Sequence, residues 1–132
     1  MIDVFFEPGQ KVNATVNGFT VRTDQSVQAG GEGTAPEPFM LFLASLGTCA
    51  GIYVKNFCQH RGIPTDQITL TMDHRYDPAT KLIDLITIRI NVPAGFPEKY
   101  EAAMIQTASL CKVKRHLSDK IRSEITVIRS NE

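Results

Sequence analysis

The sequence predicts an α+β fold, because two groups of alternating apolar residues flank a long uncharged stretch. Alternation at period two indicates strands, and it occurs before residue 24, again between residues 68 and 92, and at residues 125–128. The stretch 38–54, PFMLFLASLGTCAGIYV, instead has apolar residues at helical spacing and no charged residue. The chain has 132 residues, so we predict a single domain over residues 1–132.

A β-hairpin is the clearest local element. In residues 11–24, apolar and polar residues alternate on both sides of Asn17-Gly18. Asn-Gly supplies the two positive-φ positions of a type I′ turn, so these residues are predicted to form a hairpin, with a further strand over residues 2–6 before it. The glycine-rich segment 29–33 lacks the spacing of a phosphate-binding loop and is predicted to be a flexible connector.

The uncharged stretch is predicted to form a long helix that begins near Pro38 and ends at residues 61–64. Ala44, Gly47 and Gly51 form a small-residue stripe on one side of this helix. Such a stripe lets a second backbone approach closely, and the helix has more apolar surface than one small sheet can cover. We therefore predict an obligate homodimer with this helix at its centre.

The second half of the chain repeats the mixture of strands and helices. Residues 68–72 and 86–92 alternate around a turn at residues 76–78, which predicts a second antiparallel pair. A helix is expected from Pro97, with Cys111 on its apolar face. A short basic helix over residues 114–122 and a last strand over residues 125–128 complete the prediction.

Charge and composition narrow the class of protein. Fourteen basic and fourteen acidic residues give a net charge of zero, which does not fit a nucleic-acid partner. The stretch 38–54 is shorter than the ~20 residues of a membrane span, so no membrane partner is expected. The N-terminus lacks a basic segment followed by an apolar one, so a cytoplasmic location is predicted. In a reducing cytosol a disulfide is more often catalytic or redox-sensing than structural.

Two of the three cysteines carry the functional prediction. Cys49 lies within the uncharged helix, and Cys111 lies on an apolar face of the second helix. If the fold brings them together, the pair can supply a peroxidatic and a resolving thiol. Cys58 follows Cys49 by nine residues, on the opposite side of the helix, and is interpreted as a core residue. A buried structural role is the commoner one for any cysteine taken alone.

No metal site and no cofactor are predicted. The histidines at positions 60, 74 and 116 are scattered, and pairing one with a cysteine gives only two of the four ligands that a structural zinc needs. The basic residues between positions 112 and 122 resemble an anion patch, but at helical spacing most of them form a solvated face.

A family pattern is also present. Pro38 is followed eleven residues later by Cys49, within PFMLFLASLGTCAG, and a second cysteine stands in LCKVKRHL. This pattern, with the order of elements over nearly the whole chain, resembles the OsmC/Ohr family of hydroperoxide reductases. The resemblance implies an OsmC-like fold with antiparallel sheets wrapped around a long cysteine-bearing helix, in an intertwined homodimer with active sites at the subunit interface. It also implies that Cys49 is peroxidatic and Cys111 resolving.

The chain departs from the family pattern where the thiol is activated. The family places a glutamate one or two residues after the helix-start proline, where it holds an arginine against the thiolate; here those positions are Phe39 and Met40. Glu37, just before that proline, is the candidate substitute. Arg22 is the first candidate for the activating cation and Arg115 the second, each with a solvated surface role as the alternative. Burial alone is expected to raise the pKa of the helix thiol.

The sequence thus predicts a thiol-dependent peroxidase that reduces organic hydroperoxides through Cys49 and Cys111. A cellular dithiol is expected to return the electrons. Two alternatives stay open: an OsmC-like binding module for an apolar ligand, and a thiol redox sensor without turnover. The missing acidic residue favours the alternatives, and the presence of both cysteines favours the enzyme.

Overall fold

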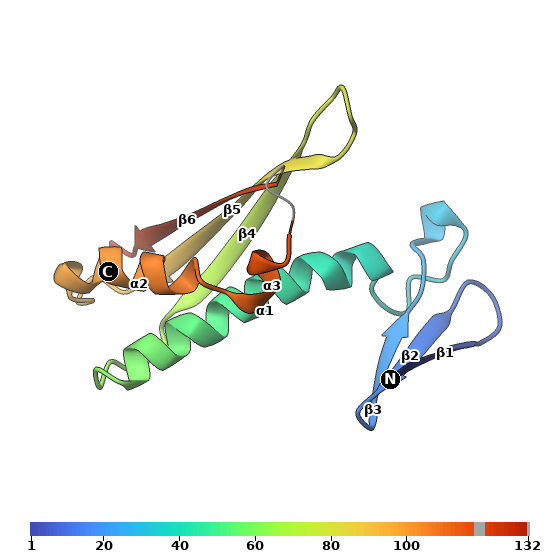
Figure 1. Cartoon of the computed structure of the whole chain (residues 1–132), viewed down its shortest axis with the longest axis horizontal. Coiled ribbons are helices and arrows are strands. Elements are labelled where there is room, and N and C mark those ends of the chain that lie inside the picture. The colour runs from blue at the N-terminus through green and yellow to red at the C-terminus, as the bar shows by residue number, and fades with distance from the viewer. Residues whose placement is uncertain (118–120, 132) are drawn as a thin grey trace. The chain divides into compact units, whose positions relative to one another are not determined.

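The computed structural model describes residues 1–117 and 121–131 of the chain (Figure 1). Contacts between residues divide it into two units, Met1–Ala44 and Ser45–Glu132. Each unit contains one three-stranded sheet, and these are β1-β2-β3 and β4-β5-β6. The prediction of a single domain over residues 1–132 stays a prediction.

The predicted N-terminal strands and hairpin are confirmed. The first sheet consists of β1 (Ile2–Phe6), β2 (Val12–Val16) and β3 (Phe19–Thr23), all antiparallel. Asn17 and Gly18 join β2 to β3 with φ angles of 50° and 81°, as the Asn-Gly pair predicts.

One face of this first sheet is apolar. Cross-strand pairing aligns Val4 with Ala14, and Ala14 with Val21, so the alternation of all three strands is in register. The side chains on this face belong to Ile2, Val4, Phe6, Val12, Ala14, Val16, Phe19 and Val21. Phe6 is 80 % exposed and Phe19 is 73 % exposed. Much of this apolar face is therefore exposed within the first unit, and exposed apolar surface of this kind marks an interaction site.

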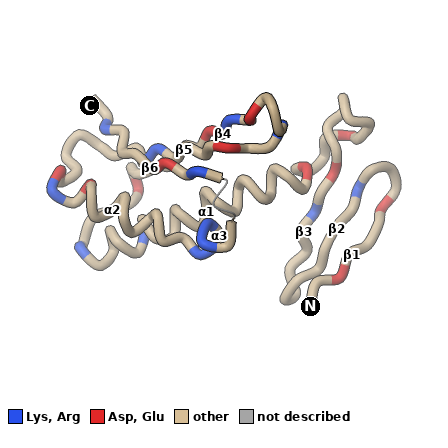
Figure 2. The backbone as a smooth tube through the Cα atoms, turned by 45° about the horizontal axis from the view of Figure 1, so that its top comes forward, with Lys and Arg blue, Asp and Glu red and all other residues tan. Residues whose placement is uncertain are grey.

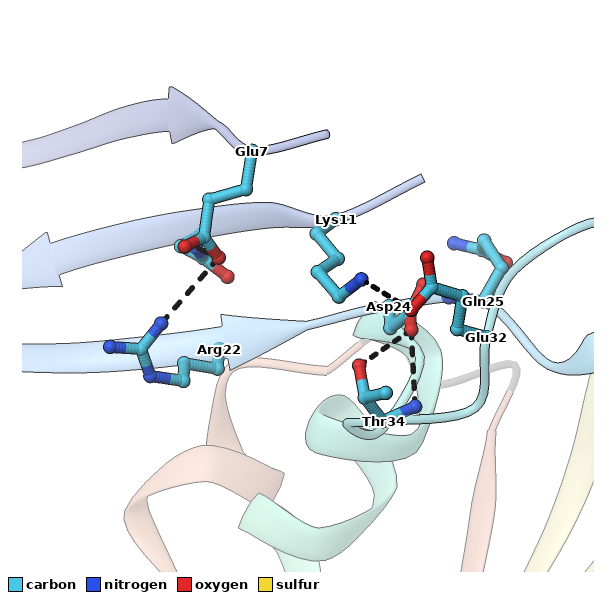
Figure 3. A network of polar contacts seen from close by, with 8 residues as sticks. Glu7, Lys11, Arg22, Asp24, Gln25, Glu32 and Thr34 are labelled. Atoms are coloured by element: carbon cyan, nitrogen blue, oxygen red, sulfur yellow. Dashed lines mark hydrogen bonds and ion pairs between the residues drawn. The ribbon is translucent and has the colours of Figure 1, made fainter. Parts of the chain in front are cut away.

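The segment between β3 and the long helix differs from the predicted flexible connector. It contains the short 3₁₀ helix η1 (Val27–Ala29), and backbone hydrogen bonds join its two ends to each other. Buried Asp24 accepts hydrogen bonds from the backbone N–H of Thr34 at 3.1 Å and from its hydroxyl at 2.7 Å (Figure 3). A Cβ atom at Gly31 would lie 2.2 Å from the Gln25 carbonyl oxygen. The glycines thus permit a tight loop, and the expectation of a flexible one is wrong.

The long helix α1 (Pro38–Gln59) begins where predicted and ends shortly before the predicted stop at residues 61–64. Its buried side chains in the second unit are Leu46, Ala50, Val54, Phe57 and Cys58. Gly62 ends the turn that follows with a φ of 65°. Among the described residues, α1 alone is long and apolar enough to cross a membrane, a property that the core helix of a soluble protein shares. Our expectation that it is too short for a span is therefore corrected.

The second sheet covers one side of α1. Strands β4 (Thr69–Tyr76) and β5 (Ile83–Val92) are antiparallel as predicted, and β6 (Arg122–Arg129) pairs with β5 in parallel. A parallel neighbour requires a crossover, which the 3₁₀ helix η2 (Glu98–Tyr100) and the helix α2 (Glu101–Ala108) supply. The core formed by these elements consists of Val54, Phe57, Cys58, Ile90, Val92, Phe96, Met104 and Ala108.

The prediction of a basic helix over residues 114–122 is wrong. The structure has a four-residue helix, α3 (Lys112–Arg115), and β6 already begins at Arg122. Burial alternates along β6 with the period of a strand. The positions 118–120 of the predicted helix lie outside the described residues. Pairing with β5 therefore outweighs the weak helical signal of this segment.

The hydrogen bonds to Asp24 lead to a testable pH dependence. Donation by Thr34, opposed by burial, lowers the pKa of the Asp24 carboxyl to about 2. A lowered pKa stabilises the folded state above the ordinary pKa of 3.8, and this contribution is lost as the pH falls toward about 2. We expect an NMR titration to give a midpoint near 2 for Asp24. In Thr34→Val, which keeps the shape but removes the hydroxyl donor, the midpoint should rise; an unchanged midpoint would contradict the assignment.

Candidate active site at Cys49 and Cys111

The structure brings Cys49 and Cys111 together in the second unit. Cys49 projects from α1, and Cys111 lies between α2 and α3. Their thiols are neighbours that shift each other's pKa, and both cysteines are free. Cys49 is half-buried, whereas Cys111 is only 2 % exposed. The two candidate thiols are thus neighbours, and Cys49 is the one open to reagents.

Backbone donors surround the Cys49 sulfur. The backbone N–H groups of Lys112 and Val113, at the start of α3, lie near enough to this sulfur to lower the pKa of Cys49. These groups are free to do so because the first N–H groups of a helix have no partner within the helix. Arg115, one turn further along α3, adds a positive charge to the surroundings of Cys49. In Figure 2 this short helix is coloured largely blue by its Lys and Arg residues.

These contacts decide the acidity of Cys49. Burial raises the pKa of the Cys49 thiol, but the hydrogen bonds from Cys111, Val113 and Lys112, together with the Arg115 charge, lower it below the ordinary value of 9.0. Burial by itself does raise this pKa, as expected, but the neighbouring donors and the Arg115 charge reverse its effect. A lowered pKa means a larger fraction of thiolate, which is the nucleophilic form of cysteine.

Cys111 has the opposite character. Burial and the neighbouring Cys49 sulfur raise the pKa of the Cys111 thiol. A neutral Cys111 thiol can donate its S–H to a Cys49 thiolate, while its own sulfur accepts the backbone N–H of Lys114 at 3.4 Å. Cys111 is thereby the N-cap residue of α3. The pair is chemically asymmetric, with one acidic thiol and one neutral thiol.

A small apolar cavity lies on the inner side of Cys111. Its volume is about 10 Å³, roughly the space of one water molecule. The residues that line it are Leu46, Ala50, Ile86, Ile88, Ala108, Cys111, Lys114, Leu117, Ser123 and Ile125. The space next to Cys111 and Lys114 is therefore not completely filled by side chains.

The other predicted site residues lie elsewhere. Arg22 is in the first unit, where its Nη1 is 3.5 Å from Oε2 of Glu7 (Figure 3). Buried Asn13 holds the same Glu7 oxygen through its side-chain amide at 2.5 Å. Glu37 is in the first unit too, and its carboxylate accepts the backbone N–H of Ser26 at 3.1 Å. The structure thus places neither Arg22 nor Glu37 in the unit that holds the thiol pair.

Cys58 lies in the hydrophobic core, with no exposed surface. Burial raises the pKa of its thiol, although the charge of Arg61 opposes the effect. Its surroundings therefore suit the core role that its helical position predicts.

The backbone donors at the start of α3 are the main feature that sequence reasoning missed. The short helix was predicted to begin at Lys114, two residues too late to place the N–H groups of Lys112 and Val113 at a helix start. Cysteine is also an uncommon N-cap residue, so the sequence carries only a weak signal of this turn. The effect of the Arg115 charge on Cys49 depends on the same turn.

Comparison with known proteins identifies the family pattern. Residues 31–126 match the family described as OsmC-like protein. No curated protein matches the chain. Among solved structures, the chain is similar to a candidate osmotic stress induced and detoxification response protein from Psychrobacter arcticus, with a TM-score of 0.80 and 18 % identity. That likeness covers 96 % of this chain and 93 % of the other.

Two further structures share the fold. An OsmC-like protein from Mycoplasma pneumoniae has a TM-score of 0.79 at 12 % identity, with coverage of 99 % of this chain and 96 % of the other. An organic hydroperoxide resistance protein from Legionella pneumophila has a TM-score of 0.68 at 16 % identity, with coverage of 97 % and 95 %. The predicted α+β, OsmC-like fold is confirmed by these similarities.

The asymmetry of the thiols predicts an order of alkylation. Cys49 should react with iodoacetamide at lower pH than Cys111 or Cys58, because it is the thiol with the lowered pKa and is partly exposed. Peptide-resolved mass spectrometry across pH 5–10 measures the three rates. Arg115→Ala should shift the Cys49 profile to higher pH, whereas Lys55→Ala on the exposed part of α1 serves as the matched control. Equal rates for Cys49 and Cys58 would refute the assignment.

Proposed function

Since the chain belongs to the OsmC-like protein family, we propose that it is a thiol-dependent peroxidase that reduces organic hydroperoxides. The observation that carries this proposal is the pairing of a Cys49 thiol whose pKa is lowered with a neighbouring Cys111 thiol whose pKa is raised. An organic hydroperoxide resistance protein among the similar structures supports the choice of substrate. The reaction needs no cofactor, because the two thiols hold the electrons.

The proposed reaction has two steps in the protein. The Cys49 thiolate attacks the terminal oxygen of the hydroperoxide, the O–O bond breaks, and the alkoxide takes a proton to leave as an alcohol. Cys49 is then a sulfenic acid. The Cys111 sulfur attacks the sulfenate sulfur, which releases water and forms a Cys49–Cys111 disulfide. A cellular dithiol returns two electrons and two protons by thiol–disulfide exchange, as a reducing cytoplasm allows.

Two cations are candidates for stabilising the thiolate. Arg115 is the better supported, because its charge acts on Cys49 within the same unit. Arg22 remains the candidate that the family resemblance implies; it contacts Glu7, whose carboxylate also accepts a hydrogen bond from Asn13. Glu37 is the weaker candidate for a supporting carboxylate, because it already accepts the Ser26 N–H.

We also propose that the chain acts as a homodimer. The apolar face of the first sheet leaves Ile2, Val4, Phe6 and Phe19 exposed, each by more than 60 %. The first unit has no buried apolar side chain except Leu43 on α1, so its sheet needs a partner surface to be stable. A second copy of the chain is the partner that the uncharged part of α1, residues 38–54, and the family resemblance favour.

The two alternatives use different properties of the same site. A binding module would need only apolar surface, and the lowered pKa of Cys49 would then have no role. A redox sensor would use the same oxidation but would not turn over with a dithiol. Turnover and thiol dependence therefore separate the three functions.

The enzyme proposal predicts substrate preference and the roles of the thiols. Reduced protein should form the Cys49–Cys111 disulfide faster with cumene hydroperoxide than with hydrogen peroxide, because apolar surroundings favour an apolar substrate. Cys49→Ser should abolish hydroperoxide consumption, and Cys111→Ser should stop at a Cys49 sulfenate that a dimedone probe captures. Stopped-flow oxidation and mass spectrometry measure these outcomes.

Cys58→Ser is the control that should retain the reaction with hydroperoxide. Arg115→Ala and Arg22→Ala, compared side by side, show which cation speeds the oxidation of Cys49. The loss of oxidation rate in that variant should become smaller at alkaline pH, because the thiol then ionises without the cation. If Cys49 remains reduced in excess organic hydroperoxide at neutral pH, the peroxidase proposal fails. Oxidation without turnover in the presence of dithiothreitol would leave the redox sensor.

The dimer proposal predicts that the two faces of the first sheet differ in their tolerance of charge. Val4→Lys places a charge on the apolar face and should weaken the dimer by tenfold or more. Thr20→Lys on the opposite face of the same sheet is the control and should leave assembly unchanged. Analytical ultracentrifugation at micromolar concentration measures both, and a monomeric wild-type protein would exclude the proposal.

A further inference from the structure

We propose that the reductant attacks the sulfur of Cys49, and not that of Cys111, when it opens the Cys49–Cys111 disulfide. This inference rests on the proposed function, because that disulfide is the oxidised form of the proposed peroxidase. It gives Cys111 a second role, as the leaving group during reduction. It also makes the opening at Cys49 the entrance for both the hydroperoxide and the reductant.

The two cysteines differ in their access to solvent. Cys49 is half-buried on α1, whereas Cys111 is only 2 % exposed. Ile52 follows Cys49 by about one turn of α1, so it lies on the same side of the helix, and it is 49 % exposed. This side of α1 is therefore open within the second unit, and a reagent in solution can reach Cys49.

Cys111 instead faces the interior of the second unit. It lines the small apolar cavity together with Leu46 and Ala50, which are buried side chains of α1. Cys49 is not among the residues that line this cavity. The Cys111 sulfur also accepts the backbone N–H of Lys114 at 3.4 Å. A thiol in solution therefore reaches Cys111 only after this packing opens locally.

The direction of displacement at sulfur leads to the same atom. A nucleophile approaches a sulfur atom in line with the bond that breaks, from the side opposite the leaving group. When Cys111 attacks the Cys49 sulfenate, it therefore enters opposite the oxygen that departs as water. The reductant in turn enters opposite Cys111, on the side from which that oxygen left. This is the side at which the hydroperoxide delivered the oxygen, so both reagents use one entrance.

The bonds and electrons of the proposed reduction balance. A thiolate of the dithiol forms a bond to the Cys49 sulfur, the Cys49–Cys111 bond breaks, and Cys111 leaves as a thiolate that takes a proton. The second thiol of the reductant then attacks its own sulfur in the mixed disulfide, which releases Cys49 as a thiolate and the reductant as its disulfide. Two electrons pass from the dithiol to the protein, and both cysteines are reduced again.

Thiol acidity acts in the opposite direction. A thiol of lower pKa leaves faster, and the pKa is lowered at Cys49 and raised at Cys111. Acidity changes the rate of exchange by about threefold per pKa unit, whereas a buried sulfur reacts only in the small fraction of molecules that have opened locally. Access is therefore the larger effect in the folded protein, and the preference for Cys49 should disappear when the protein is unfolded.

Glutathione identifies the sulfur that is attacked, because a monothiol forms a mixed disulfide and cannot close a ring to release itself. The protein is oxidised with diamide, mixed briefly with glutathione, quenched with acid and treated with N-ethylmaleimide to block the freed cysteine. Trypsin leaves the three cysteines in separate peptides, 23–55, 56–61 and 100–112, for mass spectrometry. We expect at least about tenfold more glutathione on Cys49 than on Cys111, because a buried sulfur reacts only through local opening. The same reaction in guanidinium chloride is the control and should lose this preference.

A second measurement tests the shared entrance. Ile52→Trp enlarges a side chain on the Cys49 side of α1 and should slow two reactions severalfold: alkylation of reduced Cys49 by iodoacetamide, and reduction of the disulfide by dithiothreitol. Lys55→Trp places the same bulk on another side of α1 and is the matched control, which should change neither rate. Circular dichroism checks that both variants are folded. Slower alkylation with unchanged reduction would contradict a common entrance.

Glutathione found mainly on Cys111, or equally on both cysteines of the folded protein, would overturn the proposal. Failure of diamide to form the Cys49–Cys111 disulfide would overturn it as well, since the reductant would have no such bond to open. Neither measurement uses a hydroperoxide. A protein without peroxidase activity can therefore still carry glutathione on Cys49, and an active peroxidase can carry it on Cys111, so failure of this inference is distinguishable from failure of the proposed function.

Discussion

The thiolate at Cys49 needs hydrogen-bond donors, and α1 cannot supply them. In the middle of a helix every backbone N–H is already bonded within the helix, and the neighbouring side chains of α1 are apolar or small. A negative charge placed there is costly unless another element brings donors to it. The start of α3 is that element, and the crossover from β5 through α2 brings it there. The parallel placement of β6 follows from the same crossover.

Much of the fold could be predicted because local patterns and tertiary contacts agree. The Asn17-Gly18 turn and the bounds of α1 depend on local backbone chemistry, which the sequence shows directly. The segment after Cys111 was mispredicted because its basic residues fit a helix as well as a turn and strand. The tertiary pairing of β6 with β5 decides between these possibilities, and no local signal reports it.

The sequence could predict the two thiols of the candidate site, but it could not predict the backbone donors near them. Cys49 and Cys111 stand out because the sequence predicts both on apolar helix faces, although the structure places Cys111 after the end of α2. Helical spacing places Cys58 on the far side of α1. A backbone N–H has no identity in the sequence, so the roles of Lys112 and Val113 required the structure. The search for an activating group among side chains therefore considered Arg22 first, although the nearer contribution comes from the backbone and from Arg115.

The absence of an acidic residue at Phe39 and Met40 has a different meaning once these donors are known. In the family pattern, a glutamate at those positions is needed only if the thiolate relies on an arginine that must be held in place. In this chain, hydrogen bonds from Cys111, Val113 and Lys112 already outweigh the burial of Cys49, and the Arg115 charge adds to them. Backbone donors are fixed by the fold and need no supporting carboxylate. The loss of the glutamate thus weakens the argument for a particular arginine more than it weakens the argument for a reactive thiol.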